Sequence, residues 1–71
     1  MINTNKIKIL MKDKGVTQED VSKVLGISRP TVSQKINSMR AISLDEALLL
    51  ADYLDIDMKE FKDYFFYHPV A

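Results

Sequence analysis

Residues 17–37 read TQEDVSKVLGISRPTVSQKIN, and this stretch predicts two short helices joined by a sharp turn. Thr17 and Ser28 are good N-terminal caps, and apolar residues follow each of them at helical spacing. Gly26 lies where the first helix must end and the chain must turn. The small side chain of Ser22 lets the second helix approach the first closely. Two helices joined in this way form a helix-turn-helix motif.

The segments on either side of this motif, which we place at about 17–38, are also predicted to be helical. A first helix is expected to begin near Asn3 or Thr4 and to end at Gly15. A fourth helix begins with the capping-box sequence SLDE at residues 43–46. Its core-facing stripe is expected to consist of Leu44, Ala47, Leu48, Ala51 and Leu54.

Aromatic residues dominate the C-terminal segment, where a fifth helix is predicted at about 58–67. Phe61 and Phe65 are expected in the core. Three further aromatic residues cannot all face inward from one short helix, so they are candidates for a protein interface. They are Tyr64, Phe66 and Tyr67. A homodimer seam, a different protein partner and packing of the tail are the alternatives for them.

The fold class predicted from these patterns is all-α. A chain of 71 residues makes one small domain, and no repeat or linker divides it. No segment alternates polar and apolar residues for long enough to indicate a strand. We therefore predict a single domain over residues 1–71, built as a compact bundle of about five short helices.

Charge is distributed unevenly along the chain, although the formal net charge is zero. Residues 1–40 contain eight Lys and Arg against three Asp and Glu, a net charge of +5. Residues 41–71 contain two against seven, a net charge of −5. Opposite signs on the two halves of a small domain indicate a polarised surface, with one face suited to a polyanion.

Several classes of protein are excluded by what the sequence lacks. The absence of Cys excludes a disulfide scaffold and a thiolate zinc site. No apolar run approaches the roughly 18 residues of a membrane helix, and no secretory signal is visible. His68, the single His, has no second ligand nearby, so no metal site is expected. No catalytic constellation or phosphate loop occurs, so we expect neither an enzyme, a cofactor nor a small-molecule substrate.

The helix-turn-helix residues resemble those of the Cro and repressor type, the XRE family, especially small regulators of temperate bacteriophages. The resemblance covers about residues 4–56 and rests on Thr17, Gln18, Val21, Ser22, Val24, Leu25, Gly26, Ser28 and Val32. It implies a lambda repressor-like domain that binds double-stranded operator DNA in the bacterial cytoplasm, usually as a homodimer. Two positions depart from the family pattern. Ser22 stands where Ala is more frequent, and the core residues Val32 and Ile36 are four apart instead of three.

The third helix is the expected recognition helix. With Val32 and Ile36 toward the core, its polar side chains fall on the opposite face. The residues predicted to face DNA bases are Arg29, Pro30, Thr31 and Gln34. Arg pairs with guanine and Gln with adenine, and the carbons of Thr and Pro contact the thymine methyl group. A polar helix face that only meets solvent has a similar pattern, and this alternative stays open.

A second set of residues is predicted to contact DNA phosphates. It consists of Thr17, Gln18, Ser28, Lys35, Asn37, Ser38 and Arg40. The resemblance implies that Gln18 is a clamping glutamine at the start of its helix, where free N–H groups favour an anion. Lys6, Lys8 and Lys12 are expected to be solvated surface charges.

Two hypotheses for function follow. The first is a sequence-specific DNA-binding transcription regulator of the phage Cro or repressor type that acts as a homodimer. The alternative is a small phage modulator or anti-repressor that binds a larger repressor protein, with weak or no DNA binding alone. The acidic, aromatic C-terminal half would then be the working surface.

Overall fold

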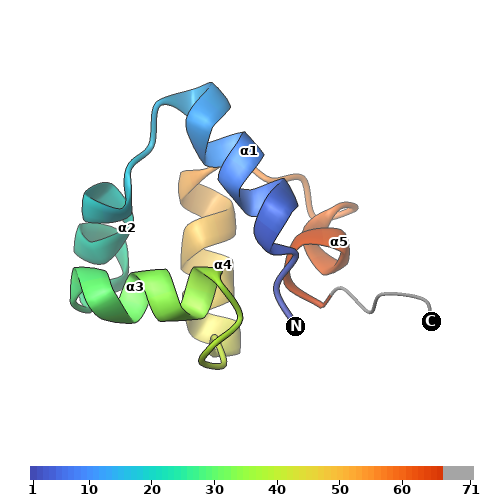
Figure 1. Ribbon diagram of the computed structural model, residues 1–71. Coiled ribbons are helices and arrows are strands. Elements are labelled where there is room, and N and C mark those ends of the chain that lie inside the picture. Colours follow the sequence, from blue (N-terminus) through green and yellow to red (C-terminus); the bar gives the residue numbers. More distant parts are fainter. Residues whose placement is uncertain (67–71) are drawn as a thin grey trace.

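The computed structural model describes residues 1–66, and this part of the chain folds into five helices without a strand (Figure 1). They are α1 (Thr4–Lys14), α2 (Gln18–Leu25), α3 (Arg29–Ile36), α4 (Leu44–Tyr53) and α5 (Phe61–Phe65). The predicted all-α class is therefore confirmed. No helix among the described residues is long and apolar enough to cross a membrane.

The ends of the helices lie where the capping residues place them. The side chains of Asn3, Thr17, Ser28 and Ser43 each accept a hydrogen bond from a backbone N–H in the first turn of a helix. Gly15 and Gly26 end α1 and α2 in the left-handed conformation, with φ of 66° and 68°. Because the left-handed region is costly for other residues, these two glycines fix where the helices stop.

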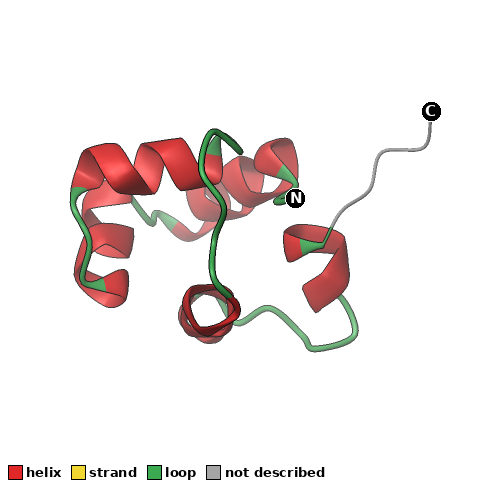
Figure 2. Cartoon of the chain, turned by 90° about the horizontal axis from the view of Figure 1, so that it is seen from below, coloured by secondary structure: helices red, strands yellow, loops and turns green. Residues whose placement is uncertain are grey.

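One hydrophobic core joins all five helices. α2 packs against α3 and α4, and α1 packs against α3 and α5. Figure 2 shows α4 end-on, on the side of the molecule away from α3. The buried side chains are Ile2, Ile7, Met11, Val21, Val32, Ile36, Ala47, Leu50, Ala51, Leu54, Ile56, Phe61, Tyr64 and Phe65. Val32 and Ile36 are both buried, which places the opposite, polar side of α3 at the surface.

The predicted stripe of α4 is wrong at two positions. Leu44 and Leu48 are 56% and 40% exposed, whereas Leu50 is fully buried. The core-facing residues are instead Ala47, Leu50, Ala51 and Leu54. This set has the same helical spacing as the predicted one, rotated around the axis. Since α4 is apolar on nearly all sides, periodicity alone did not determine its orientation.

The C-terminal helix is shorter than predicted, because α5 begins at Phe61 and Met58 lies in a turn with 67% of its surface exposed. Phe61 and Phe65 are buried, as predicted. Phe66 is 51% exposed, in keeping with a candidate interface residue. Tyr64 is only 8% exposed, so its prediction as an exposed interface residue is wrong. Tyr67 and His68 lie outside the described residues.

The N-terminal residues explain the burial of Tyr64. Ile2 is buried beside α5, and the backbone N–H of Asn3 donates to the carbonyl oxygen of Tyr64 at 2.7 Å. The ammonium group of Lys6 lies 4.5 Å from the centre of the Tyr64 ring. Lys6 therefore makes a cation–π contact, and the prediction of a purely solvated charge is wrong for this residue.

Candidate nucleic-acid interface

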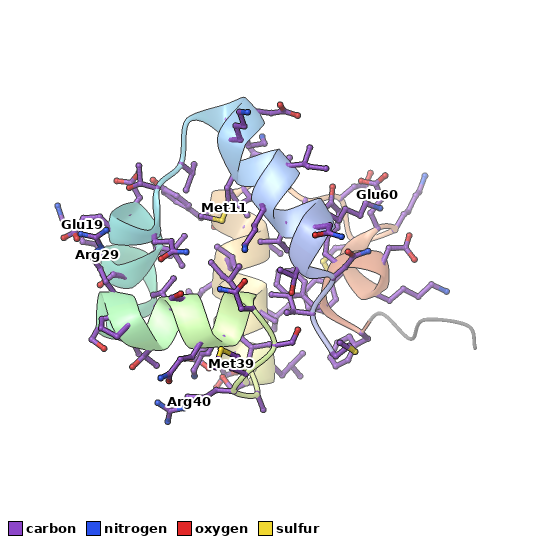
Figure 3. All side chains as sticks on the ribbon, in the orientation of Figure 1. Met11, Glu19, Arg29, Met39, Arg40 and Glu60 are labelled. Carbon is purple, nitrogen blue, oxygen red and sulfur yellow. The ribbon has the colours of Figure 1, made fainter. Side chains whose placement is uncertain are left out.

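The turn between α2 and α3 is held by hydrogen bonds across it. The Ser22 hydroxyl donates to the carbonyl oxygen of Ile27, and the carbonyl oxygen of Ser22 accepts from the N–H groups of Gly26 and Ile27. Ser22 is thus more than a small residue that permits close approach, because its hydroxyl also bridges the turn. This turn brings the first turns of α2 and α3 to the same edge of the molecule, where Figure 3 shows Glu19 and Arg29 side by side.

The N-terminal end of α3 lines an open hollow of about 440 Å³ together with the start of α2. Gln18 reaches it from α2, and Arg29, Pro30 and Ser33 reach it from α3. Arg29 and Pro30 are exposed, whereas Gln18 and Ser33 are half-buried. Three predicted contact residues are therefore neighbours in space. Ser33 was not predicted, although its position four residues after Arg29 and three after Pro30 places it on their side of the helix.

Glu19 is a second residue of this edge that was not among the predicted contacts. Its Oε2 lies 3.4 Å from Nε of Arg29, so the guanidinium of a predicted base-contacting residue is paired with an acid from α2. The neighbouring Asp20 has a different function. Its carboxylate accepts the backbone N–H of Thr17, which lowers its pKa and completes the capping box of α2.

Hydroxyl groups at the start of α3 bond to one another. Ser28 and Thr31 share a hydrogen bond of 2.8 Å between their hydroxyl oxygens, and Ser28 also caps the helix. No acidic residue lies in this first turn. The partial positive charge of the helix end therefore adds to the charge of Arg29, and the edge suits an anion.

Farther along α3, Gln34 lies close to Arg40. Nη1 of Arg40 is 3.5 Å from Oε1 of Gln34, a long and exposed hydrogen bond. Arg40 is exposed below the carboxyl end of α3 (Figure 3). Both side chains can exchange this contact for one to DNA at little cost, because exposed hydrogen bonds of this length are weak.

Lys35 is held by α4. Its ammonium group donates to both carboxylate oxygens of Glu46, at 2.6 and 2.7 Å, and both side chains are mostly shielded from solvent, with 14% and 16% exposed. The bonds from Lys35, and next the backbone N–H of Ser43, lower the pKa of Glu46. This arrangement argues against Lys35 as a phosphate contact, since its charge already links α3 to α4.

Asn37 and Ser38 are also bonded within the fold. The Asn37 amide donates to the carbonyl oxygen of Ser33 at 2.8 Å. The Ser38 hydroxyl donates to the carbonyl oxygen of Ile2 at 3.2 Å and lies 3.3 Å from the hydroxyl of Thr4. The Ser38 contacts fasten the N-terminus to the end of α3, and the Asn37 bond closes the last turn of that helix. We therefore leave both residues out of the proposed interface, as we do Lys35.

The described part of the chain shows neither a metal-binding group nor a buried polar cluster. Among residues 1–66, no group of His, Cys, Asp or Glu is suited to hold a metal ion. No polar or charged residue of this part is buried.

Comparison with known families agrees with this geometry. A family model described as a helix-turn-helix matches residues 7–61, which is more than half of the chain. The matched region includes α2, α3 and α4 in full and most of α1. A search of curated proteins finds no match. The chain belongs to the helix-turn-helix family of the XRE type, whose members are DNA-binding transcription regulators.

Proposed function

We propose that this protein is a sequence-specific regulator of the phage Cro or repressor type, which binds operator DNA in a bacterial cell through α3. The observation that carries the proposal is the shared edge of α2 and α3. There, exposed Arg29 and Pro30 stand next to Gln18 around one open hollow. In helix-turn-helix proteins the first residues of the second helix of the motif contact base edges in the major groove.

Each proposed base contact follows from the chemistry of its side chain. Arg29 donates two hydrogen bonds to guanine, and Gln34 pairs with adenine once it has left Arg40. Pro30 and the methyl group of Thr31 contact a thymine methyl group. A good bidentate contact discriminates against the wrong base by about 1–3 kcal/mol.

Phosphate contacts position α3 in the groove. We assign them to Gln18 at the start of α2 and to Arg40 beyond the other end of α3. The hydroxyls of Thr17 and Ser28 belong to the same set, because as helix caps they accept a backbone hydrogen bond and keep their own O–H to donate. The N–H groups in the first turns of the two helices support them, because such groups have no carbonyl partner within the helix.

A homodimer is proposed at the carboxyl end of α3. A hollow of about 330 Å³ lies there, lined mainly by apolar residues that include Ile42, Phe65 and Phe66. Met39 and Phe66 nearby are 75% and 51% exposed. We propose that a second copy covers these residues and that the two α3 helices of the dimer then face the same side of the DNA. The expected distance between their half-sites is about 34 Å, one turn of the duplex.

A second candidate function is favoured by the outer face of α4. Leu44, Leu48, Leu49 and Tyr53 are 40–56% exposed there, and Asp45 and Asp52 stand among them around an open hollow. Exposed apolar clusters of this kind mark protein contacts. Since α4 lies away from α3 in Figure 2, this face stays accessible when α3 is on DNA. It supports the alternative of a modulator that binds a larger repressor.

Selection of duplexes from a random-sequence library on the immobilised protein tests the first proposal. We expect a two-fold symmetric consensus with half-sites one helical turn apart, and affinity that falls steeply with salt. Sedimentation of the protein with the selected duplex should give two chains per duplex. Failure to enrich any sequence would contradict sequence-specific binding and leave the modulator as the better hypothesis.

A further inference from the structure

Glu19 and Arg29 form an ion pair within the proposed DNA-binding edge, and this pair joins the first turns of two helices. Glu19 Oε2 lies 3.4 Å from Arg29 Nε (Figure 3). The side chains are 49% and 64% exposed, and ion pairs in such positions contribute little to the stability of a fold. The dipole of α2 favours an acid in its first turn, but the pairing of this acid with Arg29 adds little to stability.

The carboxylate of Glu19 opposes DNA binding, because the phosphates carry charge of the same sign. Residues 1–40 hold only three acidic residues, Asp13, Glu19 and Asp20. Asp13 lies near the C-terminal end of α1, and the carboxylate of Asp20 is engaged in the cap of α2. Glu19 is thus the acid of this half that pairs with a predicted base-contacting residue.

The geometry of the pair leaves one side of the guanidinium available. An arginine side chain has N–H donors on Nε and on both Nη atoms. Nε of Arg29 faces Glu19, so the fork formed by Nη1 and Nη2 remains for DNA. In the major groove, guanine presents two neighbouring neutral acceptors, O6 and N7, which match this fork. A phosphate, in contrast, must approach the arginine against the charge of Glu19.

We infer that Glu19 determines specificity through Arg29: it positions the guanidinium for guanine and weakens the attraction of Arg29 for phosphates of any sequence. This inference rests on the proposed function, because it concerns the same face. In the operator complex the Glu19 carboxylate holds Arg29 against the guanine. This gain offsets the repulsion between the carboxylate and the DNA phosphates. In a complex with random DNA only the repulsion remains.

The test compares the wild-type protein with Glu19→Gln on two duplexes, the one selected from the library and a scrambled one. The amide keeps the size of the side chain and removes its charge. We expect affinity for the scrambled duplex to rise by roughly threefold to tenfold and affinity for the selected duplex to change by less than about twofold. The salt slope, meaning the slope of the logarithm of affinity against the logarithm of salt concentration, should steepen by about 0.9 on the scrambled duplex. This is the change expected for one more neutralised phosphate.

Two controls separate this effect from a change in net charge or in folding. Glu60→Gln removes the same charge from an exposed residue on the far side of the molecule (Figure 3). It should leave the ratio of the two affinities unchanged. Glu19→Asp keeps the charge and should restore most of the ratio. Thermal unfolding confirms that each variant is folded.

The dependence on Arg29 is tested by a double-mutant cycle. In an Arg29→Ala background, Glu19→Gln should no longer change the ratio of the affinities. The inference is overturned if Glu19→Gln shifts both affinities by the same factor, or if its effect persists without Arg29. A wild-type protein that selects no duplex overturns the proposed function itself. Wild-type selection with an unchanged ratio in Glu19→Gln overturns this inference alone.

Discussion

The two ends of α3 have side chains of similar polarity, but their partners differ. At the N-terminal end, Arg29 and Pro30 are exposed, and Arg29 has only a loose, solvated partner in Glu19. At the carboxyl end, Lys35 makes two short bonds to α4, and Ser38 is tied to the N-terminus. Polarity alone therefore does not identify a ligand-binding face. The useful distinction is between polar groups held by short or shielded bonds within the fold and polar groups whose partners are loose and exposed to solvent.

The largest effect that tests this contrast is expected from Arg29→Ala. Loss of a bidentate base contact should lower affinity for the selected duplex by about tenfold to a hundredfold and relax the preference for guanine at one position. Stability should change by less than about 0.5 kcal/mol, because the side chain is exposed. A binding matrix over single base changes in the duplex, with unfolding by urea, measures both.

Arg40→Ala is the matched control, since it removes the same residue type at the other end of α3. It should weaken binding to all duplexes to a similar extent and lower the salt slope by about 0.9. If Arg29→Ala also weakened all duplexes equally, Arg29 would be a phosphate contact and the proposed base contact would be wrong.

The next largest effect is expected on stability, from Glu46→Gln. The amide keeps the acceptor for the backbone N–H of Ser43 but loses the charge that pairs with Lys35. We expect the free energy of unfolding to fall by about 1–2 kcal/mol, with DNA affinity of the folded protein unchanged. Glu60→Gln, at an exposed site without a side-chain cap, should cost less than about 0.5 kcal/mol. Lost DNA affinity with unchanged stability would instead return Lys35 to the interface.

Lowering the pH should remove the same stabilisation, because it protonates the Glu46 carboxylate. The pKa of Glu46 in the folded protein is lowered from its ordinary value of 4.5, chiefly by the hydrogen bonds from Lys35. In the unfolded chain Glu46 has its ordinary pKa, so the unfolded chain binds a proton before the folded protein does as the pH falls. The stabilisation is complete above pH 4.5 and is lost as the pH falls through the lowered pKa.

The difference in unfolding free energy between wild type and Glu46→Gln isolates this carboxylate from all others. It should be constant near neutral pH and shrink toward zero in acid. A difference that grows as the pH falls would mean that the pKa of Glu46 is raised in the folded protein. Urea unfolding of both proteins between pH 7 and pH 3 measures it.

The sequence was sufficient to predict the helices, because their ends depend on local chemistry. Thr17, Gly26 and Ser28 act within one turn of their own positions, and each lies where it was predicted. Burial depends on distant partners and was harder to predict. Tyr64 is buried where Asn3 bonds to its backbone and Lys6 lies over its ring, and Lys35 is occupied because it pairs with Glu46. None of these partners is recognisable from the local pattern.

The orientation of α4 was also mispredicted because burial depends on distant partners. This helix is apolar at the positions of Leu44 and Leu48 as well as at those of Leu50 and Leu54, so two stripes fit the helical period equally well. Both stripes contain Ala47, Ala51 and Leu54, and in the fold, where α4 packs against α2, Leu50 joins them in the core while Leu44 and Leu48 stay exposed. Glu19 was missed for a related reason. An acid in the first turn of a helix is explained by the helix dipole alone, and its partner Arg29 comes from the next helix.

The smallest expected effect is a change in unfolding free energy from substitution of Ser38, which lies just beyond the carboxyl end of α3 and bonds to the N-terminal segment. Its φ of 61° lies in the left-handed region, and its hydroxyl donates to the carbonyl oxygen of Ile2. Ser38→Ala keeps the strain and loses the bond, so we expect a loss of about 0.5–1.5 kcal/mol in unfolding free energy. Ser38→Gly loses the same bond but relieves about 1 kcal/mol of strain, so its stability should be close to that of wild type.

Both Ser38 variants should bind the selected duplex with wild-type affinity, because the hydroxyl is engaged with the N-terminus and not with DNA. Urea unfolding and a titration of the duplex measure the two properties. A Gly variant less stable than the Ala variant would show that strain at this position is negligible. A uniform loss of DNA affinity in both variants would show that Ser38 contacts a phosphate. Ser38 would then join Arg40 among the phosphate contacts beyond the carboxyl end of α3.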